Sequence, residues 1–293
     1  MAAKPADPIF LDTSIQIARK VHRPEIQHSI TNRLRQHQEI VSGTVVRQEF
    51  KRRLLKEAVY LLKQLDERKS YEKVHRHVLD TLGPLQYRKM KICLDLLVTV
   101  YEEDEDEDRF DRTRLMLRDL IKNGIGTAEA HLTSINESSG CACAHQPILE
   151  KKPFVRYEFG TDRCSKVKDK CGIRAFLDGH RDLLVRLHDY LASVPDKDAS
   201  KTDELKSAQA FIRRYLDAPD GVEGEDPCLK VGDLLVALES VGCSTIYTMN
   251  IRETQHLAHF LNQSMVYRPP NSDRPEIECL TGMSDWNEKL SGG

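Results

Sequence analysis

The stretch Pro8–Ile15 limits the fold of this chain more than any other part of the sequence. Three apolar residues, Ile9–Leu11, run directly into Asp12, two hydroxyl residues and the start of a helical pattern. This arrangement predicts a short buried strand whose C-terminal end carries a carboxylate. Ligands bind beyond the carboxyl ends of strands in open α/β sheets, so Asp12 is a candidate functional residue. Taken alone, Asp12 is better explained as the N-cap of the next helix.

Two later acids occur in matching contexts, and the first of them is Glu49. Residues 39–42 predict a second short strand, and residues 42–44 open a long amphipathic helix. Apolar side chains continue at helical spacing as far as Leu65. Glu49 therefore lies in the early turns of that helix, beside the end of the predicted strand.

The second of these acids is Asp233, near the start of a mostly apolar helix predicted over residues 231–240. An N-cap role is again the alternative. A strand predicted over residues 244–248 follows, and it ends in the polar cluster at residues 249–253. Acidic and polar residues thus stand at the ends of several predicted elements that are far apart in the sequence.

In this order and context the chain resembles the PIN-domain nucleases, the fold of the VapC-type toxins. Four segments carry the resemblance: residues 10–15, 42–49, 232–237 and 248–253. The resemblance implies an α/β fold with a small, mainly parallel central sheet flanked by helices. Residues 1–66 and 227–293 would form that core, and residues 67–226 would be a long, mostly helical insertion that compact members lack.

The resemblance also implies a catalytic set composed of Asp12, Glu49, Asp233 and Asn250. The three acids would hold Mg²⁺ or Mn²⁺, which prefer hard oxygen ligands and bind through carboxylates plus substrate phosphate. Residues that touch substrate or support the acids would be Ser14, Thr248, Arg252 and Glu253. Many members place a fourth acid where this chain has Asn250. Related toxins with Thr-x-Asn at this place imply that the amide weakens one metal site without abolishing activity.

The function implied is that of an endonuclease that hydrolyses phosphodiester bonds with a divalent metal. Such an ion can activate water, orient the phosphodiester and offset developing charge. RNA is the favoured substrate and single-stranded DNA the alternative, in a toxin or a bacterial defence effector. The opposing hypothesis is a PIN-like scaffold, weakened at Asn250, that binds a partner protein or RNA through its helical insertion.

The predicted insertion, residues 67–226, has a helical pattern and almost no strand signal. Its run of seven acids, residues 102–108, is typical of a solvated helix end or loop. Residues 218–227 are polar and rich in Gly and Pro, which predicts a linker. The insertion either gates the acids, or recruits a regulatory protein or a second copy of the chain, or only enlarges the core.

The composition argues against a basic coat for nucleic acid, because 44 basic and 46 acidic residues give a net charge of −2. A local basic face at residues 47–53 is the candidate contact, with a solvated helix face as the alternative. No apolar run approaches the ~20 residues needed to cross a bilayer, and the N-terminus lacks the apolar core of a signal peptide. We therefore expect a cytoplasmic protein without membrane contact.

The eight cysteines would be reduced in that compartment, so closely spaced ones indicate metal rather than disulfides. Four of them, with His145 as an alternative ligand, could bind a structural zinc ion: Cys141, Cys143, Cys164 and Cys171. The site would clamp the loop between Gly140 and Gly172. The alternative is four ordinary thiols in a loop.

We expect protein purified without added zinc to contain one Zn²⁺ per chain. Four protein ligands leave no open position for a catalytic water, so the ion would stabilise the loop rather than take part in catalysis. Elemental analysis measures the stoichiometry. Serine at Cys141 and Cys143 should remove the zinc, whereas serine at the isolated Cys243 should not. A stoichiometry near zero in the unsubstituted protein would reduce the cluster to ordinary thiols.

Overall fold

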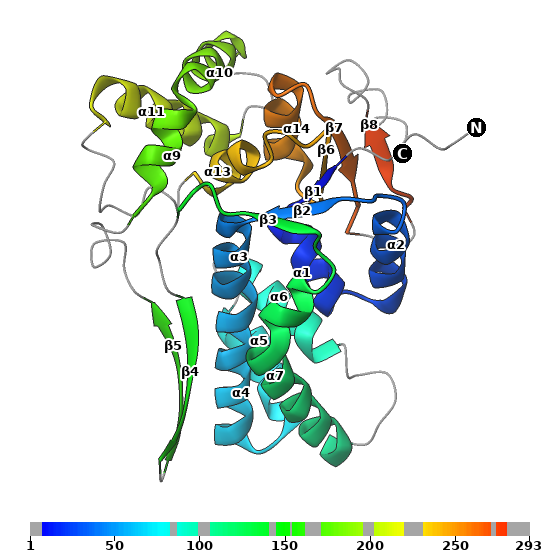
Figure 1. Cartoon of the computed structure of the whole chain (residues 1–293). Coiled ribbons are helices and arrows are strands. Elements are labelled where there is room, and N and C mark those ends of the chain that lie inside the picture. The colour runs from blue at the N-terminus through cyan, green and yellow to red at the C-terminus, as the bar shows by residue number, and fades with distance from the viewer. Residues whose placement is uncertain are drawn as a thin grey trace.

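The computed structural model describes residues 8–82, 87–98, 106–140, 145–152, 154–161, 171–195, 202–219, 231–270 and 274–279. Its strands are β1 (Ile9–Leu11), β2 (Ile40–Gly43), β3 (Ser134–Asn136), β4 (His145–Lys152), β5 (Phe154–Thr161), β6 (Thr245–Thr248), β7 (Ser264–Tyr267) and β8 (Ile277–Cys279). A central sheet with helices on both faces stands above a helical lobe, and a separate two-stranded ribbon lies beside that lobe (Figure 1).

The helices that flank the sheet and build the lobe follow one another along the chain in two groups. The first group comprises α1 (Thr13–Val21), α2 (Pro24–Leu34), α3 (Thr44–Phe50), the π-helical turn η1 (Lys51–Leu55), α4 (Lys56–Arg68), α5 (Tyr71–Leu82), α6 (Tyr87–Val98) and α7 (Asp106–Glu129). The second comprises α9 (Ile173–Gly179), α10 (Arg181–Ser193), α11 (Asp203–Asp217), α13 (Gly232–Glu239) and α14 (Ile251–Phe260). No helix within the described ranges is long and apolar enough to cross a membrane.

The central sheet has the strand order β3-β2-β1-β6-β7-β8. Neighbouring strands from β3 through β7 run parallel, and only β8 is antiparallel, to β7. All three residues of β1 are fully buried, as expected for a central parallel strand that is covered on both faces. The expected α/β fold with a mainly parallel sheet flanked by helices is confirmed.

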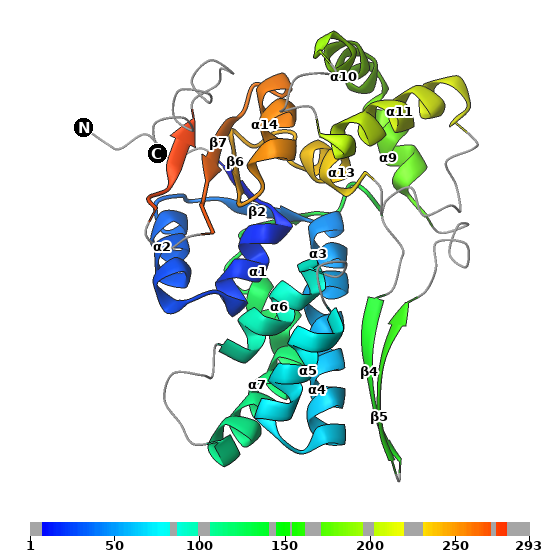
Figure 2. The ribbon, with the colours of Figure 1, turned by 180° about the vertical axis from the view of Figure 1, so that it is seen from behind.

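Alternation of side chains along β1 divides the core into two layers. Phe10 points to the face covered by α13 and α14, with α9–α11 packed beyond them. Ile9 and Leu11 point to the opposite face, where they pack against α1 and α2. Figure 2 shows the two helical layers from behind. Apolar residues of one short strand therefore hold both faces of the sheet together.

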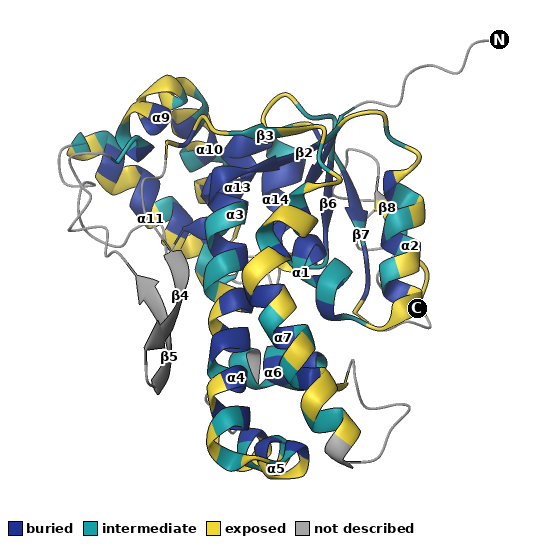
Figure 3. Cartoon of the chain, turned by 60° about the horizontal axis from the view of Figure 1, so that its bottom comes forward, coloured by how far each residue is buried: buried dark blue, intermediate teal, exposed yellow. Residues whose placement is uncertain are grey.

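The lobe is built on one continuous helical path that leaves the sheet at β2. The path runs through α3, η1 and α4 and ends at Lys69, whose left-handed backbone (φ 54°) stops it. Helices α5, α6 and α7 pack on α4 around a second buried cluster. Figure 3 shows the buried residues on the inner faces of these helices.

Residues 67–226 are less separate from the sheet than the sequence indicates. Within them, β3 pairs with β2 as an edge strand of the central sheet, and α9–α11 share the core cluster of Phe10. Helix α7 continues to Glu129, and Ser134–Asn136 is a strand within the region that the sequence predicts to be helical. Strand β3 contains only one apolar residue, so its sequence shows no strand pattern. It is a strand because it pairs with β2.

The antiparallel ribbon β4–β5 is a second departure from the helical expectation. Its two strands pair along their full length and lie beside η1 and α4 (Figure 1). Two expected features fall mainly outside the described residues. These are the acidic run, described only from Asp106, and the linker, of which residues 220–227 are not described.

A buried carboxylate, Glu239, joins α13 to the start of the continuous helix formed by α3, η1 and α4, which we call the lobe helix. Its two side-chain oxygens both accept the backbone N–H of Val45, at 3.1 Å each. Its backbone carbonyl accepts a bond of 2.7 Å from the Asn136 amide. A negative group at a helix N-terminus is favourable, so Glu239 ties α13, α3 and β3 together at one point. No local pattern in the sequence distinguishes Glu239 from other helical acids.

Replacing Gly43 with alanine should destabilise the protein by about 1–3 kcal/mol. The added Cβ would lie 1.9 Å from Oε2 of Glu239, so the carboxylate would have to leave Val45. Urea unfolding measures the change. Gly126→Ala is the matched control, because nothing lies near its new Cβ and it should gain roughly 0.4–1 kcal/mol. Equal stabilities for the two variants would show that Glu239 can move without cost.

Candidate active site

The carboxyl edge of the sheet has its switch point at β1. Strands β2 and β3 extend from β1 in one direction, and β6 and β7 extend in the other. Asp12 directly follows β1, and Thr248 ends the neighbouring parallel strand β6. Open α/β sheets bind ligands in the crevice at such a point, so the topology itself selects this edge.

Asp12 is buried, with 8% of its surface exposed. Its Oδ2 accepts two hydrogen bonds of 2.7 Å, from the hydroxyls of Ser14 and Thr248. Asp12 occupies the N-cap position of α1, but its side chain makes no capping hydrogen bond. The N-cap explanation is therefore wrong for this side chain, which is directed across the sheet to β6 instead.

Glu49 is buried to a similar extent, one turn and a half into the lobe helix. Its Oε2 accepts a hydrogen bond of 2.7 Å from the hydroxyl of Thr13. Its Oε1 lies 3.4 Å from Nη2 of Arg53 and 3.8 Å from Nη2 of Arg52. Each oxygen of Glu49 thus has a defined neighbour, a hydroxyl on one side and guanidinium groups on the other.

The negative charge of Glu49 acts on Asp12. Burial raises the pKa of Asp12 above its usual value, and the charge of Glu49 raises it further. The hydroxyls of Thr248 and Ser14 and the charge of Arg53 act in the opposite direction. The structure therefore brings together Asp12 and Glu49, two of the three acids that the sequence predicts to converge.

The third acid, Asp233, is half-buried at the second position of α13. The residue before it, Gly232, packs so closely on Glu49 that a Cβ there would lie 2.5 Å from Oε1. The N-cap of α13 is Val231, so the N-cap explanation is wrong for Asp233 as well. The start of α13 thus lies against Glu49, while its end lies against Val45 through Glu239.

Hydroxyl groups also shape the turn after β6. The hydroxyl of Thr248 accepts the N–H of Asn250 at 2.9 Å, and that of Ser14 accepts the N–H of Met249 at 2.9 Å. These same hydroxyls donate to Asp12, so each links the carboxylate to the turn. The half-buried Asn250 is therefore linked to Asp12 through the hydroxyl of Thr248.

Arg252 and Glu253 are the other two predicted site residues after β6, and the structure describes only the first of these side chains. Arg252 is exposed in the first turn of α14, and within the described structure no contact joins it to Asp12 or Glu49. The side chain of Glu253 lies outside the described part. Arg252 therefore does not support the acids in this arrangement, and its contact with substrate stays a prediction.

The donor set can be compared with what a divalent ion requires. Among the described side chains, no group of three His, Cys, Asp or Glu residues is arranged to hold a metal. Asp12 and Glu49 instead form a two-carboxylate arrangement, and Mg²⁺ in proteins is usually bound through one or two carboxylates plus waters and substrate phosphates. The pair fits that requirement without a third acid.

Three of the cysteines expected to bind zinc, Cys141, Cys143 and Cys164, lie outside the described residues, as does the side chain of His145. The glycines beside the loop are described. Gly172 donates its N–H to the carbonyl of Gly140 at 2.9 Å, and Gly140 has a φ of +55°.

A Cβ on Gly140 would lie 2.9 Å from the Cα of Gly172. The sequence neighbours of Cys141 and Cys171 are thus in direct backbone contact, and Cys171 is half-buried against the core.

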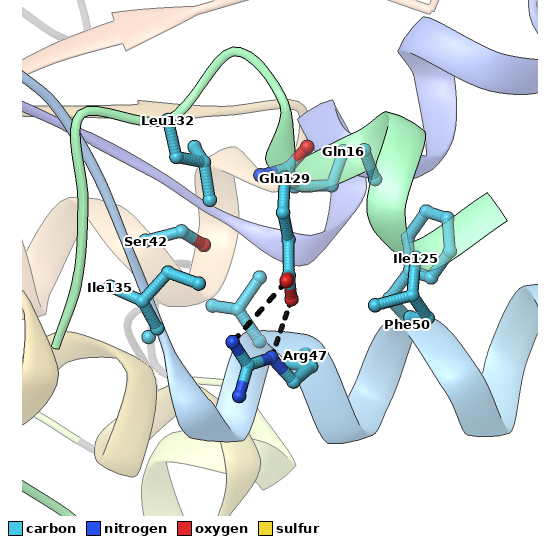
Figure 4. Close-up of a pocket in the computed structure, with 11 residues that line it drawn as sticks. Gln16, Ser42, Arg47, Phe50, Ile125, Glu129, Leu132 and Ile135 are labelled. Carbon is cyan, nitrogen blue, oxygen red and sulfur yellow. Dashed lines mark hydrogen bonds and ion pairs between the residues drawn. The ribbon is translucent and has the colours of Figure 1, made fainter. Parts of the chain in front are cut away.

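A small cavity of about 20 Å³ lies between β2, α3 and α7 (Figure 4). It is large enough for a single water molecule and too small for a nucleotide. Arg47 closes it by an ion pair with Glu129 and lies 3.6 Å from Glu137. This cavity is therefore a packing feature of the lobe, separate from the acids.

Thr13, Arg53 and Gly232 belong to the site, although the sequence analysis did not assign them a role there. Thr13 stands between Asp12 and Ser14, so its proximity to the acids is a local signal. Arg53 is four residues after Glu49, which is neighbouring spacing on a helix. Gly232 has no such signal, because its contact with Glu49 spans the whole lobe.

Comparison of the chain with protein-family models, with curated proteins and with solved structures finds no match. The functional proposals therefore depend on the geometry of the site and on the resemblance of the four sequence segments.

Replacing Asp12 with asparagine should raise the free energy of unfolding at pH 8, measured without divalent ions. The substitution removes a desolvated charge and its repulsion by Glu49. A gain of about 0.5–2 kcal/mol is expected, the usual range for one stabilising change. Asp111→Asn, at an exposed position of α7, is the control and should have little effect.

The direction in which stability changes with pH follows from the raised pKa of Asp12 in the folded state. The folded protein holds the proton more tightly, so stability of the unsubstituted protein falls as pH rises through that pKa. The advantage of Asp12→Asn should therefore be greatest at pH 7–8 and shrink toward pH 4. An advantage that grows toward acid pH would contradict the assignment.

Proposed function

We propose that this protein is a metal-dependent nuclease that hydrolyses phosphodiester bonds, with RNA as its substrate. The observation that carries the proposal is the buried pair of Asp12 and Glu49 at the carboxyl edge of the sheet, beside its switch point. Two carboxylates that repel each other while buried cost stability. Such strain is common where a site is built for a ligand.

Asp12 and Glu49 would hold the Mg²⁺ or Mn²⁺ ion directly, and Asp233, at the start of α13, would bind a water molecule of the ion. Carboxylate oxygens are the ligands that these ions prefer. When bound, the ion would orient the phosphodiester and offset the negative charge that develops on it. A cation here would also oppose the rise in the pKa of Asp12 that burial and, to a smaller extent, the charge of Glu49 produce.

The chain's own hydroxyls position these acids. Thr248 and Ser14 fix one oxygen of Asp12, and Thr13 fixes one oxygen of Glu49. The carboxylates are thereby preorganised and lose little conformational freedom when a ligand arrives. The backbone N–H of Asn250 donates to Thr248, and its side-chain amide would donate to a phosphate oxygen or to a water molecule.

The mainly parallel sheet flanked by helices agrees with the PIN-like core that the sequence resembles. The preference for RNA over single-stranded DNA, the role as a toxin or defence effector, and a cytoplasmic location derive from that resemblance. We place the regulatory partner, or a second copy of the chain, at the helical lobe, where Leu79 of α5 and Leu115 of α7 are exposed.

A binding module without catalysis is the second candidate. It is favoured by Asn250, which stands where many related nucleases have an acid, and by the two-acid rather than three-acid arrangement among the described residues. In that case the protein would bind a partner protein or RNA through its helical insertion and would not cleave nucleic acid.

Purified protein should cleave a 20-nucleotide single-stranded RNA in Mn²⁺ or Mg²⁺ and not in EDTA. Asp12→Asn, Glu49→Gln and Asp233→Asn should each reduce the rate by about 10²-fold or more, because each removes a carboxylate that the ion needs. Gel analysis of labelled RNA measures cleavage, with a matched single-stranded DNA alongside. The exposed Asp111→Asn is the control and should retain full activity.

Asp12→Asn should lose cleavage while gaining stability, which separates loss of chemistry from loss of fold. Retained cleavage in both Asp12→Asn and Glu49→Gln would overturn this mechanism. RNA binding without cleavage in any divalent ion would support the binding module.

A further inference from the structure

We infer that Arg53, together with Arg52, holds Glu49 until a divalent ion binds and then binds the phosphates of the substrate. The inference rests on the proposed function for its substrate class. It adds two residues that the proposed chemistry does not otherwise use, and it predicts that metal and guanidinium compete for one oxygen of Glu49.

The contact geometry is the first support. Nη2 of Arg53 lies 3.4 Å from Oε1 of Glu49, and Nη2 of Arg52 lies 3.8 Å from the same atom. The other oxygen of Glu49 is held by Thr13. Oε1 is therefore the oxygen that an ion would take, and in this arrangement it faces two fixed positive charges.

Exposure is the second support. The side chain of Glu49 is 5% exposed, whereas those of Arg52 and Arg53 are 20% and 45% exposed. The guanidinium groups thus extend from the surface toward a buried acid. A group in this position can turn outward to a phosphate in solvent, which the buried carboxylates cannot do.

The reach of Arg53 extends to Asp12 as well. Its charge opposes the rise in the pKa of Asp12 that burial and Glu49 produce. Arg53 therefore offsets the negative charge of both acids, which is the electrostatic role that a divalent ion would have between them.

The basic residues of the face at residues 47–53 have two different surroundings. Arg47 is neutralised by Glu129 at the small cavity (Figure 4). Glu137 lies 3.6 Å from Arg47 as well. Lys51 lies close enough to Arg47 and Glu129 for their charges to act on it. Arg52 and Arg53 are thus the members that face the acids of the candidate site.

Arginine suits this double role. Its guanidinium is always charged and can bind a phosphate with two parallel hydrogen bonds. Both arginines lie in the π-helical turn η1, directly after α3. Turns of this kind are rare and frequently occur at functional sites, because they widen the helix locally.

Two variants and a matched control test the inference. Arg53→Gln removes one charge, and the double variant R52Q/R53Q removes both. Arg76→Gln is the control, because Arg76 forms the same i,i+4 ion pair with Glu72 at 3.3 Å on the exposed face of α5. Arg53→Lys keeps the charge and tests whether a point charge is enough.

The first measurement is the Mn²⁺ concentration at the midpoint of the metal-induced rise in melting temperature. Arg53→Gln should lower that midpoint by about two- to fivefold, the effect of removing a partly exposed ion pair that competes for Oε1. Arg76→Gln should leave it unchanged. An unchanged or higher midpoint in Arg53→Gln would overturn the competition.

The second measurement is the affinity for the 20-nucleotide RNA at several salt concentrations with the site filled by Ca²⁺, which also takes carboxylate oxygen ligands and would release the arginines from Glu49. The double variant should bind more weakly and lose about 1–2 from the slope of log affinity against log salt, whereas Arg53→Lys should keep the slope. Unchanged affinity and slope would overturn the phosphate role. A lower Mn²⁺ midpoint in a protein that never cleaves RNA would sink the nuclease proposal while leaving the competition at Glu49 intact.

Discussion

Parallel pairing of β1 with β2 on one side and β6 on the other is the constraint on which the rest of the structure depends. It aligns Ile9 with Ile40 and with Thr245, residues from three distant parts of the chain. Once that register is fixed, Asp12 and Thr248 end neighbouring strands at the same edge, and α3 leaves β2 beside them. The site is a consequence of strand pairing rather than of any local motif.

The helix α13 then fixes the position of α3 relative to the sheet. It lies along α3, with Gly232 against Glu49 at one end and Glu239 on Val45 at the other. One short apolar helix thereby sets the position of the lobe helix and closes the site next to Asp233. The use of glycine at both contacts, Gly43 and Gly232, reflects the lack of space for a Cβ beside a buried carboxylate.

The distribution of charge around the site determines where a negatively charged ligand would be attracted. Two buried acids face a pair of arginines that are partly open to solvent, in a protein whose net charge is close to zero. A polyanion would be drawn to such a place only locally, because the rest of the surface provides no general positive field. Arg47, neutralised by Glu129, shows that a basic run in the sequence does not by itself make a binding face.

The sequence by itself determined the elements that carry a strong local pattern. Ile9–Leu11, the helix that bears Glu49, α13 and β6 were all predicted, because buried strands and amphipathic helices record their burial in apolar spacing. It also selected Asp12, Glu49 and Asp233. Tertiary structure decided what those acids contact. Whether Asp12 caps a helix or crosses to Thr248 depends on a partner 236 residues away. The strand β3, with one apolar residue, exists only through its pairing with β2. Arg53 lies at neighbouring helical spacing from Glu49, so the sequence places that pair. Gly232 acquires its role because packing brings it to Glu49, and no local periodicity encodes such a long-range contact.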